Sequence, residues 1–65
     1  MAEIWKPQHV NTWKDWIATI ENELSDELTS WETTFIDSIS NQIKEGRQLS
    51  QRQEEILERI YSRTP

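Results

Sequence analysis

The feature that most constrains the fold of this chain is the spacing of its apolar residues, which recur every three or four positions in three separate segments. At about 100° of rotation per residue, this spacing places the apolar side chains of each segment on one face of an α-helix. A half-buried β-strand would need an apolar residue at every second position, and no segment shows that pattern. The sequence therefore predicts an all-α protein.

The first segment predicts a helix over about residues 7–24, with Pro7 in its first turn, where a missing N–H costs nothing. Its apolar stripe consists of Val10, Trp13, Ile17, Ile20 and Leu24. An acidic stretch over residues 21–27 follows at the end of the stripe. Carboxylates are unfavourable at the negative end of a helix dipole, so we expect the helix to end there.

The second and third segments each begin with a capping box, in which a Ser or Thr side chain and a Glu or Gln three residues later cap each other's backbone amides. Thr29 and Glu32 predict a second helix over about residues 30–45, which Gly46 ends in a left-handed conformation. Ser50 and Gln53 predict a third helix over about residues 51–62.

The apolar faces of these two helices are expected to complete one small core. The second face consists of Trp31, Phe35, Ile36, Ile39 and Ile43, and the third of Ile56, Leu57, Ile60 and Tyr61. We expect Trp13 and Trp31 to lie in the core. Because the connections are short, neighbouring helices should be antiparallel, and residues 1–65 should form a single three-helix bundle.

The composition argues against several classes of function. Cysteine is absent, His9 is the only histidine and Gly46 is the only glycine. These residues supply no catalytic triad and no glycine-rich phosphate loop, so we expect neither an enzyme nor a bound cofactor. The acidic stretch lacks the alternation and central glycine of a calcium loop, so we expect no metal site. No apolar run is long enough to cross a membrane, and we expect a cytoplasmic protein.

The formal charge of −5 is unevenly distributed along the chain. Residues 1–37 contain two lysines and eight carboxylates, a net charge of −6, whereas residues 38–65 contain five basic and four acidic residues, a net charge of +1. An acidic surface in the first half would suit a mimic of DNA phosphates, and its candidate residues are Glu21, Glu23, Asp26 and Glu27. Alternatively, this charge only keeps a small tryptophan-rich protein soluble.

The third helix carries a line of arginines. Arg52, Arg59 and Arg63 fall within about 40° of one another around the helix axis, and Arg47 lies in the connection before them. Such a line would suit nucleic-acid phosphates or an acidic protein partner. Because the neighbouring acidic residues offset most of this charge, we expect any nucleic-acid binding to be weak and sensitive to salt.

The alternative interpretation of the third helix is a solvated surface without a partner. Glu55 lies four residues before Arg59, the favourable order for an ion pair along a helix. Glu54 and Glu58 are then expected to cover the face opposite the arginines.

Two tryptophans lie outside the predicted core. Trp5 precedes the first helix, and Trp16 lies at the edge of its apolar stripe. If both are exposed on one edge of the bundle, they form an aromatic patch of the kind that anchors a protein interface. Alternatively, both pack onto the bundle and increase the area that its small core buries.

Residues 31–61 carry a longer pattern, which reads Trp31-x-x-x-Phe35-x-x-Ser38-Ile39 followed by Gly46-Arg47-x-Leu49-Ser50-x-x-Gln53-x-x-x-Leu57-x-x-Ile60. The pattern resembles a short helical module of small bacteriophage proteins, found also at the ends of some phage DNA-metabolism proteins. The resemblance implies a phage or prophage setting, a location in the host cytoplasm and a binding role. It carries over no catalytic residue.

Three hypotheses of function follow. The first is a non-enzymatic interaction or regulatory protein of phage type that binds a protein partner of DNA replication, recombination or transcription. Its candidate contact residues are Trp5, Trp16, Arg47, Arg52, Arg59 and Arg63. The second is an acidic DNA-mimic inhibitor of a host nucleic-acid-binding or defence protein. The third is a weak direct nucleic-acid binder that uses the third-helix arginines, and an exposed apolar edge would also permit a homodimer.

Overall fold

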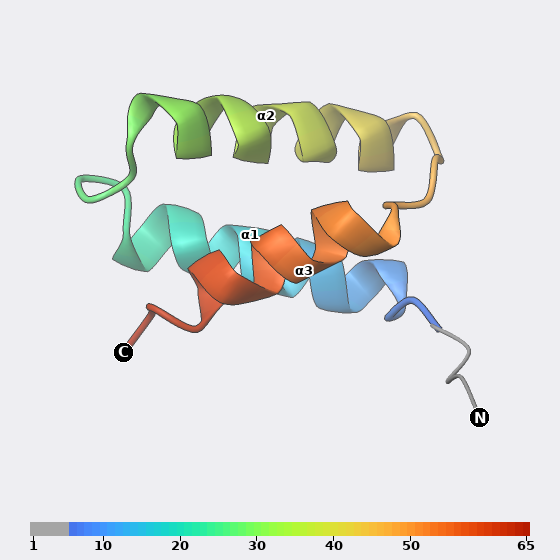
Figure 1. Cartoon of the computed structure of the whole chain (residues 1–65), viewed down its shortest axis with the longest axis horizontal. Helices are drawn as coiled ribbons and strands as arrows, with labels where there is room; N and C mark the ends of the chain where they lie inside the picture. The colour runs from blue at the N-terminus through green and yellow to red at the C-terminus, as the bar shows by residue number, and fades with distance from the viewer. Residues whose placement is uncertain (1–5) are drawn as a thin grey trace.

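The computed structural model describes residues 6–65, and three α-helices make up most of this part of the chain (Figure 1). They are α1 (Val10–Glu23), α2 (Ser30–Lys44) and α3 (Gln51–Tyr61). α2 runs antiparallel to both other helices, so α1 and α3 point in the same direction (Figure 1). The predicted all-α three-helix bundle is confirmed, and each helix end lies within three residues of its expected position.

Both predicted capping boxes are formed. The Thr29 hydroxyl oxygen accepts from the Glu32 amide at 3.1 Å, and the Glu32 carboxylate accepts from the Thr29 amide at 2.9 Å. Ser50 and Gln53 make the same pair of bonds at 3.1 and 2.9 Å. Each box pairs amides that the first turn of a helix leaves without a partner, so α2 and α3 begin where local sequence directs.

Gly46 ends α2 as expected, with a φ of 79° that L-residues rarely adopt. Around it, the Arg47 amide donates to the Gln42 carbonyl and the Gly46 amide to the Ile43 carbonyl, both at 3.0 Å. This pair of bonds is the Schellman arrangement, which closes the last turn of a helix and reverses the chain. The short connection that follows buries Leu49 and starts α3 in the opposite direction.

The core lies where the three apolar faces meet. Its buried members are Trp13, Ile17, Ile20, Leu24, Ile36, Ile39, Ile43, Leu49, Leu57 and Ile60. α1 packs closely against both other helices, whereas the backbones of α2 and α3 approach each other at fewer places. The bundle is therefore built around α1, and the seam between α2 and α3 is its loosest junction.

The expected start of the first helix at residue 7 is wrong. α1 begins at Val10, because His9 is its N-cap in an extended conformation, and the His9 Nδ1 atom accepts from the Asn11 amide at 3.1 Å. The preceding Gln8 amide donates instead to the Glu54 carboxylate of α3 at 2.8 Å. A contact with a distant helix thus holds this segment outside α1.

The expected position of Glu54 on a solvated face is also wrong. The residue is only 6% exposed, and the same carboxylate oxygen that binds the Gln8 amide accepts from the Trp13 indole N–H at 2.7 Å. A buried carboxylate is tolerated when hydrogen bonds replace the water it has lost. Glu54 therefore joins α1, α3 and the segment before α1.

The prediction that Trp31 lies in the core is also wrong. The residue is 60% exposed and lies outside the core. The predicted apolar face of this helix took every fourth residue from Trp31 to Ile43. Each step of four residues rotates the side chain by about 40° around the helix axis. Three steps carry Trp31 about 120° away from Ile43. The buried face of α2 is centred instead on Ile36, Ile39 and Ile43.

Candidate functional site

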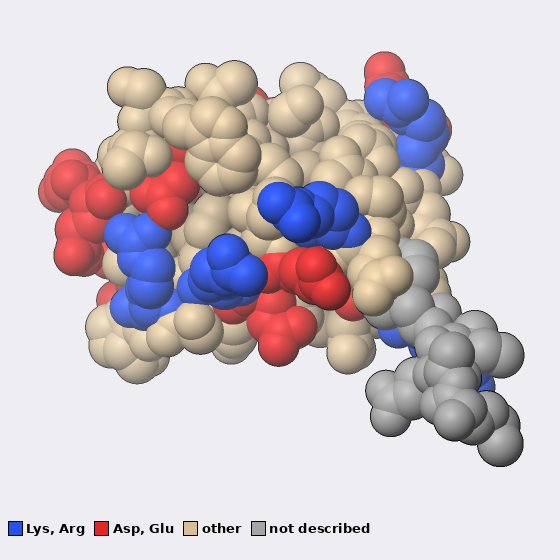
Figure 2. Space-filling model, in the orientation of Figure 1, with Lys and Arg blue, Asp and Glu red and all other residues tan. Residues whose placement is uncertain are grey.

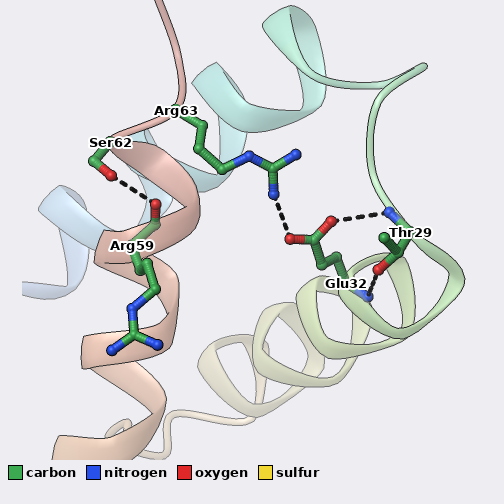
Figure 3. Close-up of polar contacts among 5 residues, drawn as sticks. All are labelled: Thr29, Glu32, Arg59, Ser62 and Arg63. Carbon is green, nitrogen blue, oxygen red and sulfur yellow. Dashed lines mark hydrogen bonds and ion pairs between the residues drawn. The ribbon is translucent and has the colours of Figure 1, made fainter.

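The seam between α2 and α3 is held at both ends by polar contacts. Near the connection, the Gln42 and Gln53 side-chain amides bond reciprocally at 3.1 and 3.0 Å, and Gln42 also donates to the Gln48 carbonyl at 2.8 Å. At the other end, the Arg63 guanidinium donates to the Glu32 carboxylate (Figure 3). These contacts join the two helices where their backbones approach least closely.

Between the two polar ends lies an open hollow of about 300 Å³, which we call the Trp31–arginine groove. Its lining residues combine apolar and basic side chains: Trp31, Glu32, Arg52, Ile56, Arg59, Ile60 and Arg63. On the face shown in Figure 2, basic groups follow one another along α3, with acidic groups below the middle of the row and also above and beside its left end, and uncharged surface above the rest. An apolar wall beside a row of cations suits a partner that is both apolar and acidic.

Glu32 fixes one end of the groove. One of its carboxylate oxygens accepts from the Thr29 amide of the capping box, and the other accepts from Arg63 (Figure 3). The bond from the Thr29 backbone amide, together with the charge of Arg63, lowers the pKa of Glu32 below its ordinary value of 4.5 against the opposing effect of burial. Arg63 is therefore already committed to a partner within the bundle.

Arg52 and Arg59 differ from Arg63 in this respect. Both are exposed, and neither makes an ion pair with any residue that the structure describes. The ion pair expected between Glu55 and Arg59 is not formed. Two guanidinium groups thus face solvent along the groove, and an incoming carboxylate could pair with them without displacing a partner.

The aromatic side of the groove is Trp31, which stacks on Phe35 one helical turn later. Their ring centroids are 5.4 Å apart, and the ring planes differ by 8°. Phe35 is half-buried against the core, so it supports an indole that is itself mostly in water. A large, pre-positioned aromatic surface of this kind is typical of residues that anchor protein interfaces.

The other predicted contact residues are not brought together with this groove. Trp16 is half-buried and stacks on Tyr61 at 5.3 Å, which joins α1 to the end of α3 and favours the packing interpretation. Arg47 is exposed in the α2–α3 connection, forms an ion pair with Glu45 at 2.9 Å and lines a different hollow beside Pro7 and Trp13. Trp5 lies outside the described residues.

The predicted acidic residues lie at one end of the bundle, in the last turn of α1 and the turn that follows it. All four are exposed: Glu21, Glu23, Asp26 and Glu27. Within residues 6–65, no group of three or more potential ligand side chains is placed to hold a metal ion. Among the helices of this same part of the chain, none is sufficiently long and apolar to span a bilayer.

Sequence reasoning missed two features of this groove, the exposure of Trp31 and the ion pair between Glu32 and Arg63, and it also missed the burial of Glu54 in the core. The exposure of Trp31 could have been predicted, since helix geometry alone shows that residues spaced by four rotate progressively away from one face. The other two join residues 31 and 41 or more positions apart, so no local pattern marks them. No family model matches the chain, and no curated protein or solved structure matches it.

Proposed function

We propose that this protein is a non-enzymatic interaction module that binds a protein partner through the Trp31–arginine groove. The observation that carries the proposal is the exposed Trp31 indole, which lies in one groove with two guanidinium groups that have no ion pair among residues 6–65. Exposing a tryptophan to this extent forgoes the free energy of its burial, which a partner would recover.

The charges favour a partner over a purely structural role for the arginines. An exposed arginine that pairs with a neighbouring carboxylate adds little to stability and commonly serves solubility alone. Arg52 and Arg59 have carboxylates nearby in sequence yet pair with none of those described. Their side chains remain available to an acidic partner, and tryptophan and arginine are the residues most often found to dominate binding energy.

The experiment that tests the proposal compares partner capture by the wild-type chain and by Trp31→Ala. Immobilised protein is exposed to a lysate of the cells that produce it, and the captured proteins are quantified by mass spectrometry. We expect one or more proteins captured by the wild type to fall at least tenfold with Trp31→Ala, because truncating a central aromatic anchor typically costs 2 kcal/mol or more.

Thr34→Ala is the matched control, because Thr34 is exposed on the same helix and does not line the groove. Circular dichroism of both variants checks that helicity is retained. Equal capture by the wild type and Trp31→Ala, with both folded, would rule out the groove as the binding surface.

The acidic end of the bundle supports a second candidate function, inhibition of a nucleic-acid-binding protein by mimicry of phosphates. Its support is the exposure of all four candidate carboxylates on consecutive turns at the end of α1. The two candidates use different surfaces, so variants of one surface leave the other intact. A phage setting and a partner in DNA replication, recombination or transcription stay predictions that the resemblance of residues 31–61 motivates.

A further inference from the structure

We propose that the element bound in the Trp31–arginine groove is an acidic amphipathic helix of the partner, which lies along the α2–α3 seam as a fourth helix. This inference rests on the proposed function and specifies what the groove takes. The partner helix would carry two carboxylates seven residues apart, with apolar residues three and four positions after the first. Its charges would pair with Arg52 and Arg59, and its apolar side chains would contact Trp31 and Ile56.

The packing of the bundle provides the place for such a helix. α1 covers one side of the seam and packs against both α2 and α3, whereas the opposite side carries the open groove. In Figure 1, α3 lies in front of α1, and Figure 2 shows the surface of the same face, with basic groups along α3. Four helices around a common core are a stable arrangement, and an amphipathic helix in an apolar groove is a recurrent mode of recognition.

The spacing of the arginines determines the spacing of the carboxylates that the partner helix must carry. Arg52 and Arg59 are seven residues apart on α3. With a rise of 1.5 Å per residue, their positions are separated by about 10.5 Å along the helix axis and lie within about 20° of each other around it. Ile56 lies between them and also lines the groove. A partner helix with carboxylates at the same seven-residue spacing meets both guanidinium groups in either direction of the chain.

The occupant is a different protein rather than a second copy of this one. No two acidic residues anywhere in the sequence are seven positions apart, so none of the helices of a second copy offers the matching pair of carboxylates. A protein helix is also favoured over nucleic acid. Glu32 forms part of the groove, and the net charge of −5 repels a polyanion with a phosphate at every nucleotide more strongly than a helix with two carboxylates.

Two synthetic helical peptides test the register. Both have the same composition, but one carries two glutamates seven positions apart with leucines three and four positions after the first. In the other, the glutamates are five positions apart, which turns the second carboxylate about 140° away around the helix. The affinity of each fluorescein-labelled peptide for the full chain is measured by fluorescence anisotropy at low salt. We expect the first peptide to bind at least tenfold more tightly.

Charge reversal then tests the two arginines. We expect Arg52→Glu/Arg59→Glu to weaken binding of the first peptide by a factor of ten or more, and a peptide with lysines in place of the glutamates to bind this variant better than it binds the wild type. Arg47→Glu is the control, because Arg47 is also exposed but lies outside the groove. It should leave the affinity unchanged.

The outcomes separate this inference from the proposed function. The proposal of an acidic helix is ruled out if both peptides bind equally, if neither peptide binds, or if the charge reversal has no effect. If Trp31→Ala nevertheless abolishes partner capture, the groove remains the binding surface, but its occupant is not an acidic helix. Displacement of the first peptide by a single-stranded oligothymidylate would identify nucleic acid as the occupant. Self-association that the groove variants abolish would identify a second copy, and either result overturns the inference.

Discussion

At the scale of single residues, Glu54 shows how a small core can depend on one polar group. Its carboxylate accepts hydrogen bonds from the Trp13 indole and the Gln8 amide, and its residue is almost fully buried. Trp13 is a large core residue that is 3% exposed, and its indole N–H needs an acceptor when it leaves water. Glu54 of α3 therefore satisfies the buried indole of Trp13 in α1 and positions the segment that precedes α1.

Replacing Glu54 by Ala should lower the free energy of unfolding by about 1–3 kcal/mol, because two donors lose their buried acceptor. Glu54→Gln keeps a carbonyl oxygen and should cost less. Urea denaturation followed by circular dichroism measures both. The control is Glu55→Ala, at an exposed neighbouring position, which should change the free energy by no more than about 0.5 kcal/mol. Similar losses for Glu54→Ala and Glu55→Ala would show that the hydrogen bonds to Glu54 contribute nothing measurable.

At the scale of helices, the capping box of α2 does more than start the helix. Glu32 caps the Thr29 amide and also pairs with Arg63, which lies just beyond α3 (Figure 3). A local device that begins one helix thereby attaches it to the end of another. The same carboxylate borders the groove, so the cap also fixes the position of the neighbouring binding surface.

The lowered pKa of Glu32 predicts a pH dependence with a defined sign. Since its ionised form is favoured in the folded state, its contribution to stability is present above pH 4.5, the ordinary value, and is lost as the pH falls through the lower pKa of the folded state. Glu32→Gln keeps a side chain that can complete a capping box but removes the charge. We expect it to be less stable than the wild type at pH 7, by less than about 1 kcal/mol because the pair is partly exposed.

This difference should be smaller at pH 3, because the pH has then fallen below 4.5 toward the lower pKa of the folded state. Thermal denaturation of both proteins at the two pH values measures it. Asp37→Asn, at an exposed carboxylate on the same helix, shows how much of the effect comes from net charge alone. A difference for Glu32→Gln that is as large at pH 3 as at pH 7 would show that the ionised carboxylate is not its cause.

At the scale of the whole molecule, charge is separated between two surfaces. Four exposed carboxylates gather at the end of α1, whereas exposed arginines line the α2–α3 groove, with Glu55 and Glu58 beside Arg59. The molecule therefore has a local basic surface although its net charge is −5. This separation would orient an approaching partner that carries both acidic and apolar side chains, because unlike charges attract at the groove and like charges repel at the end of α1.

Neutralising the acidic end distinguishes the two candidate functions. We expect the combined variant Glu21→Gln/Glu23→Gln/Asp26→Asn/Glu27→Gln to capture the same partner as the wild type, because the groove is unchanged. It should be at least as stable in thermal denaturation, since these carboxylates lie near the negative end of the α1 dipole. Loss of partner capture by this variant, with retention by Trp31→Ala, would favour phosphate mimicry.

Local sequence determined much of this fold. Thr29 with Glu32, Ser50 with Gln53, and Gly46 each act within a few residues of themselves, so the starts of α2 and α3 and the end of α2 follow from short-range hydrogen bonding and backbone conformation. The three-or-four spacing also identified the buried face of α1. The arginines at 52, 59 and 63 were placed on one side of a helix by the same periodicity, and they line one groove.

Tertiary structure alone decided which polar groups those helices bury or join. Glu54 becomes a core acceptor only when α1 brings Trp13 against it, and its carboxylate then also binds the Gln8 amide just before the N-cap of α1. Arg63 finds Glu32 only when α2 and α3 lie antiparallel. Helical periodicity fixes the direction of a side chain around its own axis, but a buried polar contact depends on what another helix places opposite it. For that reason the sequence determined the helices and the line of arginines, whereas packing decided which arginines stayed unpaired beside an exposed Trp31.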